Sequence, residues 1–149
     1  MTGAVMTDNE QLIRDSVAAF NSSDWDAARA LAADDYRYEE TGTGRAYEGV
    51  EDAIAALVAW KAAFPDGAGT VERVVSAGDL TVAEVRWRGT HTGPLATPDG
   101  EVPATGRPID LWGSMWAVWV DGRMTHQRNH LDVLTMMVQL GLVPAPSQH

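Results

Sequence analysis

Residues 107–131 read RPIDLWGSMWAVWVDGRMTHQRNHL, two strand-like runs that are joined by Asp121 and Gly122. An Asp-Gly pair between two such runs is a strong local signal for a tight hairpin turn, because both residues tolerate the backbone angles that the turn requires. We therefore expect residues 107–120 and 123–131 to form neighbouring antiparallel strands. The rest of the fold can be built outward from this hairpin.

Two further β-rich runs precede the hairpin, at 70–77 and 80–93, and Gly78-Asp79 separates them. A brief strand with alternating tyrosines is expected earlier in the chain, in DDYRYEE at 34–40. The loop from Pro94 to Pro108 is too short to separate two domains. We therefore expect residues 1–149 to form a single domain.

Apolar residues recur at helical spacing in three segments before the main β-rich region. These segments cover about 8–21, 25–32 and 50–64. A fourth apolar stripe, from Leu134 to Leu142, indicates a helix after the last strand. Helices followed by a meandering sheet predict an α+β fold, with three N-terminal helices packed on one face of a curved antiparallel sheet.

Composition restricts the classes of partner. Eleven Lys and Arg face twenty-one Asp and Glu, which gives a net charge of −10 and disfavours nucleic acid and anionic membrane surfaces. No apolar run approaches the roughly 20 residues that cross a bilayer, and the N-terminus lacks the pattern of a signal peptide. Cysteine is absent, which excludes disulfides and thiolate chemistry. We expect a cytoplasmic protein with a small-molecule ligand.

Alternate residues share a face of a strand, so His126, Arg128 and His130 point together, and Asp132 continues their row if the strand extends that far. The opposite row, which contains Gln127 and Asn129, is also mostly polar. Periodicity therefore does not decide which row faces a pocket. The preceding strand carries bulky apolar groups on both faces, which is expected when either a partner subunit or the curl of the sheet covers one of them, and this favours a homo-oligomer.

Asp132 is the best placed candidate for proton transfer. A carboxylate at the mouth of an apolar pocket is desolvated, and desolvation raises its pKa toward neutrality. Asp132 also precedes the C-terminal helix and could cap it, a role compatible with catalysis. His91 shares an apolar face with Trp87, and such a histidine, taken alone, is more often a hydrogen-bonded core residue than a catalyst.

Six tryptophans are many for this length, and core packing explains most of them, although a planar aromatic ligand would also need such walls. His126 and His130 could converge on a metal only from a helix, and they lie in a predicted strand. No nucleophile elbow, phosphate loop or dinucleotide fingerprint is present. We expect chemistry that uses no metal and no other cofactor.

Several short motifs, none specific alone, follow one another along nearly the whole chain in a characteristic order and spacing. They are AFN at 19–21, YEG at 47–49, AFPD at 63–66, GTHTG at 89–93, PATGRPI at 103–109, VDGR at 120–123 and LDVLTMMVQLG at 131–141. In these motifs the chain resembles the SnoaL-like polyketide cyclases of the nuclear transport factor 2-like superfamily. The resemblance implies a cone-shaped α+β barrel with a deep apolar pocket, a homo-oligomer and an aromatic polyketide ligand.

The resemblance also implies a reaction, intramolecular aldol ring closure with Asp132 as general acid/base. Asp132 would remove a proton made acidic by flanking carbonyls and later return it to the alkoxide that ring closure forms. His91, Arg128 and His130 are candidates to hydrogen-bond a substrate carbonyl. Further candidates for contact with the ligand are Phe20, Trp87, Asp110, Trp112 and Trp116.

Two departures from the cyclase pattern keep other functions open. Asn129 and His130 stand where many relatives carry a tryptophan or an acidic residue, and the strand at 110–119 lacks a histidine. A hydroxylase or an epoxide-hydrolase-like enzyme would use Asp110, Arg128 and Asp132 as a set. A ligand-binding module without catalysis is a further alternative, because fold does not fix function.

Overall fold

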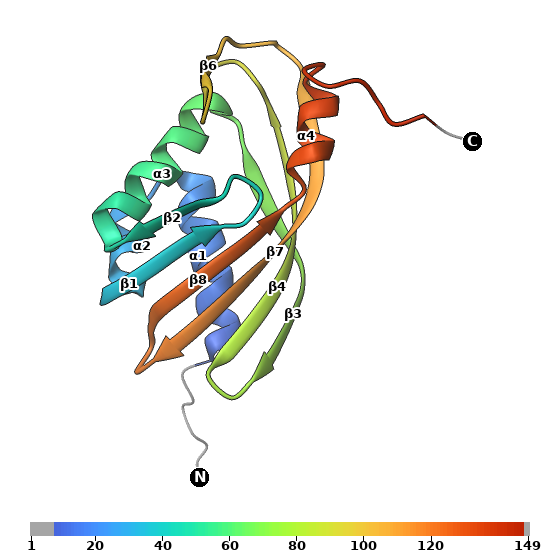
Figure 1. The fold of residues 1–149 in the computed structure, drawn as a ribbon. Helices are drawn as coiled ribbons and strands as arrows, with labels where there is room; N and C mark the ends of the chain where they lie inside the picture. The colour runs from blue at the N-terminus through green and yellow to red at the C-terminus, as the bar shows by residue number, and fades with distance from the viewer. Residues whose placement is uncertain (1–7, 148–149) are drawn as a thin grey trace.

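In the computed structural model, residues 8–147 form four helices and eight strands (Figure 1). The helices are α1 (Asn9–Ser22), α2 (Trp25–Leu31), α3 (Val50–Ala63) and α4 (Val133–Gln139). The strands are β1 (Ala32–Glu40), β2 (Arg45–Glu48), β3 (Ala68–Ala77), β4 (Leu80–Thr90), β5 (Leu95–Thr97), β6 (Gly100–Val102), β7 (Pro108–Val120) and β8 (Arg123–Leu131).

Six strands build one curved sheet in the order β2-β1-β8-β7-β4-β3. The hairpins predicted around Gly78-Asp79 and Asp121-Gly122 are confirmed, since β3 pairs antiparallel with β4 and β7 pairs antiparallel with β8. The prediction of a purely antiparallel sheet is wrong at one pair, because β1 runs parallel to β8. Parallel neighbours need a long crossover, and here most of the chain lies between them.

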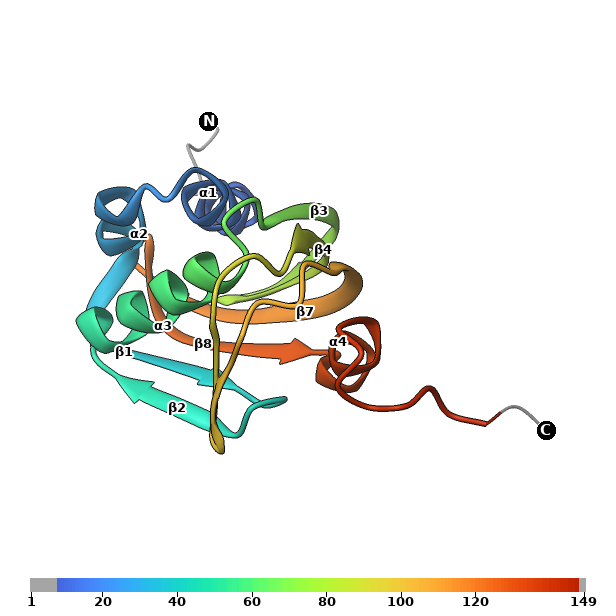
Figure 2. The same ribbon diagram turned by 90° about the horizontal axis from the view of Figure 1, so that it is seen from above.

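Helices α1, α2 and α3 lie on one side of the curved sheet, and α4 follows β8 and packs on β7 (Figure 2). The sequence predicts three helices ahead of the sheet, whereas α3 comes after β1 and β2, which both belong to the main sheet. The helix expected after Asp132 is present as α4. The expected loop at 94–108 contains a small extra hairpin, β5 and β6.

The core has two apolar clusters that meet at Trp87. One lies between α1, α3 and the sheet around Ile13, Val17 and Trp119. The other lies under the end of α3 around Phe64 and Leu140. No helix within residues 8–147 has the length and apolar character that crossing a membrane requires.

Candidate functional site

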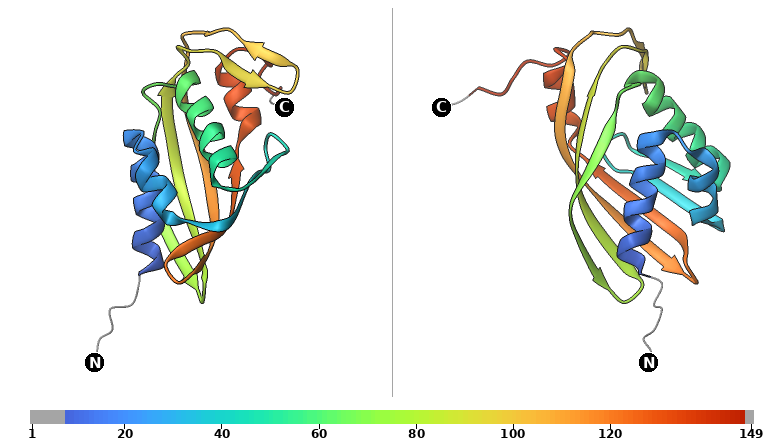
Figure 3. Two further views of the ribbon diagram at one scale, coloured as in Figure 1. Left: turned by 90° about the vertical axis from the view of Figure 1, so that its left-hand side faces the viewer. Right: turned by 180° about the vertical axis from the view of Figure 1, so that it is seen from behind.

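Residues of α1, α2, α3 and the sheet line a cavity. Figure 3 shows these three helices lying over the sheet. The volume of the cavity is about 140 Å³, and its walls are largely apolar. Phe20 and Trp87, two of the predicted ligand contacts, line it with their rings edge to face at 5.3 Å between centroids. Polar side chains on the wall come mainly from β1 and β8.

Strand β8 presents Gln127 and Asn129 to the cavity, which is the row opposite to the one from which site residues were predicted. A bulge contributes to this arrangement. Val118 pairs with His126 and Trp119 pairs with Met124, so Thr125 has no partner on β7. Met124 and Gln127, three residues apart, therefore both line the cavity.

Glu40, at the end of β1, places a carboxylate in this cavity and is only 5% exposed. Its Oε2 accepts hydrogen bonds from the Tyr38 hydroxyl at 2.8 Å and from the Trp60 indole N–H at 2.7 Å. Its Oε1 accepts from the Thr43 hydroxyl at 2.9 Å. A buried carboxylate is tolerated when such donors replace water.

A chain of hydrogen bonds runs along the cavity wall to Glu40, crossing between β1 and β8. The Tyr36 hydroxyl donates to Gln127 Oε1 at 2.8 Å, and Gln127 Nε2 donates to Asn129 Oδ1 at 2.8 Å. Asn129 Nδ2 donates to the Tyr38 oxygen at 3.2 Å, and Tyr38 donates to Glu40. The parallel pairing of β1 with β8 makes this series of hydrogen bonds possible, because Tyr38 pairs with Gln127 and Glu40 pairs with Asn129.

Tyr36 and Tyr38, the two tyrosines in this series of hydrogen bonds, remain hydrogen-bond donors. Burial raises the pKa of the Tyr36 hydroxyl, and burial together with the nearby Glu40 carboxylate raises the pKa of Tyr38 well above its usual value. The single hydroxyl hydrogen of Tyr38 therefore points to Glu40. Its oxygen must accept from Asn129, which fixes the orientation of that amide and, through it, of Gln127.

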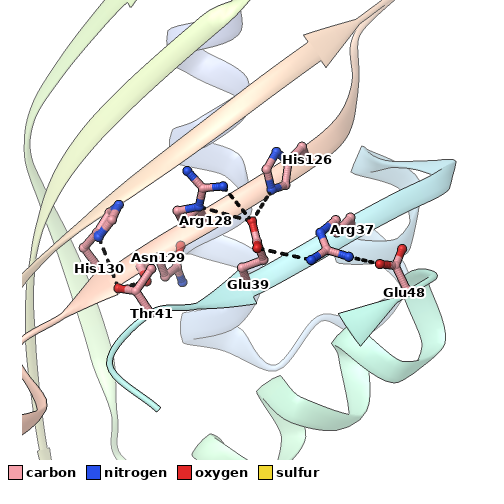
Figure 4. A network of polar contacts seen from close by, with 8 residues as sticks. All are labelled: Arg37, Glu39, Thr41, Glu48, His126, Arg128, Asn129 and His130. Carbon is pink, nitrogen blue, oxygen red and sulfur yellow. Dashed lines mark hydrogen bonds and ion pairs between the residues drawn. The ribbon is translucent and has the colours of Figure 1, made fainter. Parts of the chain in front are cut away.

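The predicted row His126, Arg128 lies on the outer face of the sheet, around Glu39 (Figure 4). Glu39 Oε2 accepts from Arg128 at 3.0 and 3.1 Å and lies 2.6 Å from His126 Nε2, and Arg37 bonds its Oε1. The hydrogen bond from His126, followed by those from Arg128 and Arg37, lowers the pKa of Glu39 from 4.5 to about 2. Arg128 therefore forms an ion pair with Glu39 outside the cavity.

Asp132 stands at the junction of β8 and α4, one residue after the lining residue Leu131, and does not itself line the cavity. Its side chain is exposed and accepts from the Thr135 backbone N–H at 3.0 Å and the Thr135 hydroxyl at 2.6 Å. This is the helix cap that its position predicts.

His91 is fully buried and also lies outside the cavity lining, although its ring packs against the lining residue Phe64. Its Nδ1 accepts from the Thr105 backbone N–H at 3.2 Å, which assigns the ring hydrogen to Nε2. Burial lowers the pKa of His91 and so favours the neutral ring. Nε2 has no hydrogen-bond partner among the described residues.

Of the remaining predicted contacts, Asp110, Trp112 and Trp116 do not line the cavity, whereas His130 does. Trp112 and Trp116 are 46% and 43% exposed, and Asp110 forms ion pairs with Arg86 and Arg88. His130 contributes to the lining, but its Nδ1 lies 3.1 Å from Thr41 Oγ1 and its ring packs edge-on against the exposed Trp116.

The structure does not assemble the alternative set of Asp110, Arg128 and Asp132. Arg128 pairs across the sheet with Trp116, six residues from Asp110 along β7 and so roughly 20 Å away. Across residues 8–147, no three His, Asp or Glu side chains are grouped so that they could hold a metal ion.

The sequence profile of SnoaL-like polyketide cyclases matches residues 10–140. The chain belongs to the SnoaL-like family. Among the structures similar to this SnoaL-like chain is IdmH from Streptomyces antibioticus, described as a candidate polyketide cyclase. The two are 30% identical, with a TM-score of 0.78 over 90% of this chain and 99% of the other. No curated protein sequence matches the chain.

Two other solved structures share the fold of this SnoaL-like chain. A candidate SnoaL-like polyketide cyclase from Jannaschia sp. CCS1 is 24% identical, with a TM-score of 0.82 over 97% of this chain and 99% of the other. AclR from Streptomyces galilaeus, a candidate hydroxylase, is 20% identical, with a TM-score of 0.81 over 96% and 87%. At these identities the likeness extends to the fold alone.

Proposed function

We propose that this SnoaL-like chain is an enzyme of aromatic polyketide tailoring that closes a ring by intramolecular aldol addition without a cofactor. The observation that carries the proposal is a carboxylate buried in a largely apolar cavity whose walls include Phe20, Trp60 and Trp87. Aromatic walls suit a planar ligand, and a desolvated carboxylate suits proton transfer to and from it.

The reaction needs one group that takes up a proton and returns it. A C–H bond between two carbonyls breaks, the electron pair spreads into an enolate, and the enolate carbon adds to a ketone in the same molecule. The alkoxide that forms then takes the proton back. The substrate stabilises its own carbanion, which is why the proposal includes no metal or Schiff base.

The resemblance assigns this proton transfer to Asp132. For that role the Asp132 carboxylate would have to leave its hydrogen bonds to Thr135 and turn toward the cavity beyond Leu131. Asp132→Asn tests the role cleanly, because asparagine is as good a helix cap as aspartate and cannot accept the proton. Arg128→Ala is the matched surface control, since Arg128 is bound to Glu39.

The function is tested with a naphthalene that carries adjacent acetoacetyl and 2-oxopropyl side chains, so that the CH₂ between the two acetoacetyl carbonyls can add to the neighbouring ketone. Aldol closure of this compound gives a six-membered ring and a product of unchanged mass, whereas hydroxylation adds one oxygen atom. We expect chromatography with mass detection to show the cyclised isomer at a rate above that of buffer, and Arg128→Ala to retain this rate. Calorimetric binding of the compound without any conversion would instead identify a ligand-binding module.

A further inference from the structure

Glu40 is the carboxylate that the cavity contains, and no motif of the sequence singles it out. It continues the row of Tyr36 and Tyr38 on β1, which are 6% and 2% exposed. Donors from three places converge on it, namely Tyr38 on β1, Thr43 in the loop after β1, and Trp60 on α3. Its Oε1 has one of these donors, so that oxygen keeps a lone pair for a ligand.

The wall beside Glu40 also offers unused donors. Among the contacts of the described residues, the amide nitrogens of Gln127 and Asn129 each use one of their two N–H groups. The two amides are hydrogen-bonded to each other at 2.8 Å and both residues line the cavity, so the amides lie side by side on its wall. Paired donors of this kind suit the two oxygens of a β-dicarbonyl group or of its enolate.

We infer that Glu40 is the residue that transfers the proton in this cavity, on a substrate whose acidic C–H lies between two carbonyl groups. The inference rests on the proposed function and assigns its central step to a residue other than Asp132. Gln127 and Asn129 hold the carbonyl oxygens, and Tyr38, Thr43 and Trp60 are positioning residues that aim the carboxylate.

The step balances without a further reactant. Oε1 of Glu40 takes the proton as the C–H bond breaks, and the negative charge moves from Glu40 to the enolate oxygens beside the two amides. The enolate carbon forms the C–C bond with the ketone carbon, whose π electrons move to its oxygen. The protonated Glu40 then returns its proton to that alkoxide and is again a carboxylate.

Hydrogen–deuterium exchange isolates the proton transfer from ring closure. Ethyl benzoylacetate is an aromatic β-keto ester with an acidic CH₂ between its two carbonyls. In D₂O the proton NMR signal of this CH₂ decreases as deuterium replaces hydrogen, and the rate of the decrease is measured. We expect the protein to accelerate this loss and Glu40→Gln to reduce the accelerated rate by about 100-fold or more. Glu39→Gln is the matched control, since Glu39 is the neighbouring residue, lies on the opposite face of β1, and should leave the rate unchanged.

Circular dichroism checks that Glu40→Gln is folded. If it is not, Glu40→Asp takes its place, because it keeps the charge but withdraws the carboxylate by one methylene, and a drop of about tenfold is expected. A folded Glu40→Gln with the wild-type exchange rate overturns the inference, as does an unchanged Glu40→Asp.

The same assay separates the two proposals. If the wild-type protein neither exchanges the β-keto ester nor cyclises the naphthalene compound, the proposed function itself fails. If it does either and Glu40→Gln does so equally, only the assignment to Glu40 fails. Loss in Asp132→Asn together with full retention in Glu40→Gln returns the step to Asp132.

Discussion

Asp132 accepts two hydrogen bonds from Thr135 at the start of α4. Its contribution to the stability of the fold can be measured separately from any role in catalysis. We expect Asp132→Ala to lower the free energy of unfolding by about 1 kcal/mol, because an N–H of the first helical turn loses its acceptor. Asp132→Asn should cost much less. Urea unfolding followed by tryptophan fluorescence measures both.

The control for Asp132 is Asp24, which caps α2 through the backbone N–H of Ala27 at 3.1 Å. Asp24→Ala should cost a similar amount, and Asp24 does not line the cavity. An unfolding free energy that does not change in Asp132→Ala would mean that the cap is not formed in solution.

Glu40 and the inward-facing row of β8 could be predicted from the sequence only in part. The alternating tyrosines of DDYRYEE correctly indicate a strand, and Glu40 falls in the same alternate row as Tyr36 and Tyr38. A carboxylate in the same row as two tyrosines was the sequence signal for Glu40. This signal can be recognised only once the row is known to face the interior. For β8 the sequence offered two polar rows, and no local property of Gln127 or His126 chooses between them.

At the scale of elements, the loop after β4 is held against the end of α3. The backbone N–H groups of Thr92 and Gly93 both donate to the carbonyl of Ala63, at 3.2 and 3.1 Å. A Cβ added at Gly93 would lie 1.9 Å from the carbonyl oxygen of Ala62, which is backbone and cannot rotate away. Glycine is therefore required for this close approach.

We expect Gly93→Ala to lower the free energy of unfolding by about 1–3 kcal/mol, because loop and helix must separate to admit the methyl group. Thermal unfolding by circular dichroism provides the measurement. The exposed neighbour Thr92→Ala keeps its backbone hydrogen bond and serves as the control. Equal stability of the two variants would contradict the contact between this loop and α3.

The Glu39 cluster links β1 to β8 and gives stability a defined dependence on pH. The pKa of Glu39 is lowered from 4.5 to about 2, first by His126 and then by Arg128 and Arg37. Its contribution is therefore complete above about pH 4.5 and is lost as the pH falls toward 2, because the unfolded chain takes up the proton first. Glu39→Gln should make the unfolding free energy fall less steeply across that window.

Urea titrations at several pH values within the window test this expectation, with the exposed Glu101→Gln as control. Asp66 and Asp110 also have lowered pKa values, from hydrogen bonds to Thr90 and Arg86 respectively, so some slope remains in every variant. A slope in Glu39→Gln equal to that of the wild type would show that the cluster does not stabilise the fold.

Elements were predicted more reliably than their pairing. Turn chemistry at Asp121-Gly122 and Gly78-Asp79 fixed two hairpins, because it is local. The parallel pairing of β1 with β8 and the bulge at Thr125 depend on contacts between distant segments, which periodicity does not encode. These two features decide which side chains of β8 enter the cavity.

At the scale of the whole molecule, the outer face of the sheet carries an apolar row that runs across three strands and ends at an arginine on a fourth. Register places Val75, Val82, Trp116 and Arg128 side by side on β3, β4, β7 and β8. Val75 and Trp116 are 57% and 43% exposed. An exposed row of this kind is typical of a surface that is covered in an oligomer.

We expect light scattering after gel filtration to give a mass above that of one chain, and Trp116→Glu to lower it toward that of the monomer. Val58→Glu is the matched control, because Val58 is similarly exposed at 42% but lies on α3. A wild-type monomer at high micromolar concentration would contradict the expectation.

Overall architecture followed from the sequence through the order of helices and strands and through the motif series from AFN to LDVLTMMVQLG. The α+β class and the family could be predicted because they depend on many weak signals spread over the chain. The cavity wall could not, because Glu40 and Asn129 are 89 residues apart in sequence and become neighbours only in the folded sheet.

The parallel pairing of β1 with β8 has a consequence for how the protein is made. A nascent chain that has reached the end of β7 already contains α1, α2, α3 and β1, but β1 still lacks one of its two neighbours. Pairing between strands that are far apart in sequence is slow, and an unpaired strand edge can associate with other chains. Protection of β1 during synthesis therefore depends on β8, and chains that stop short of residue 123 should aggregate rather than fold.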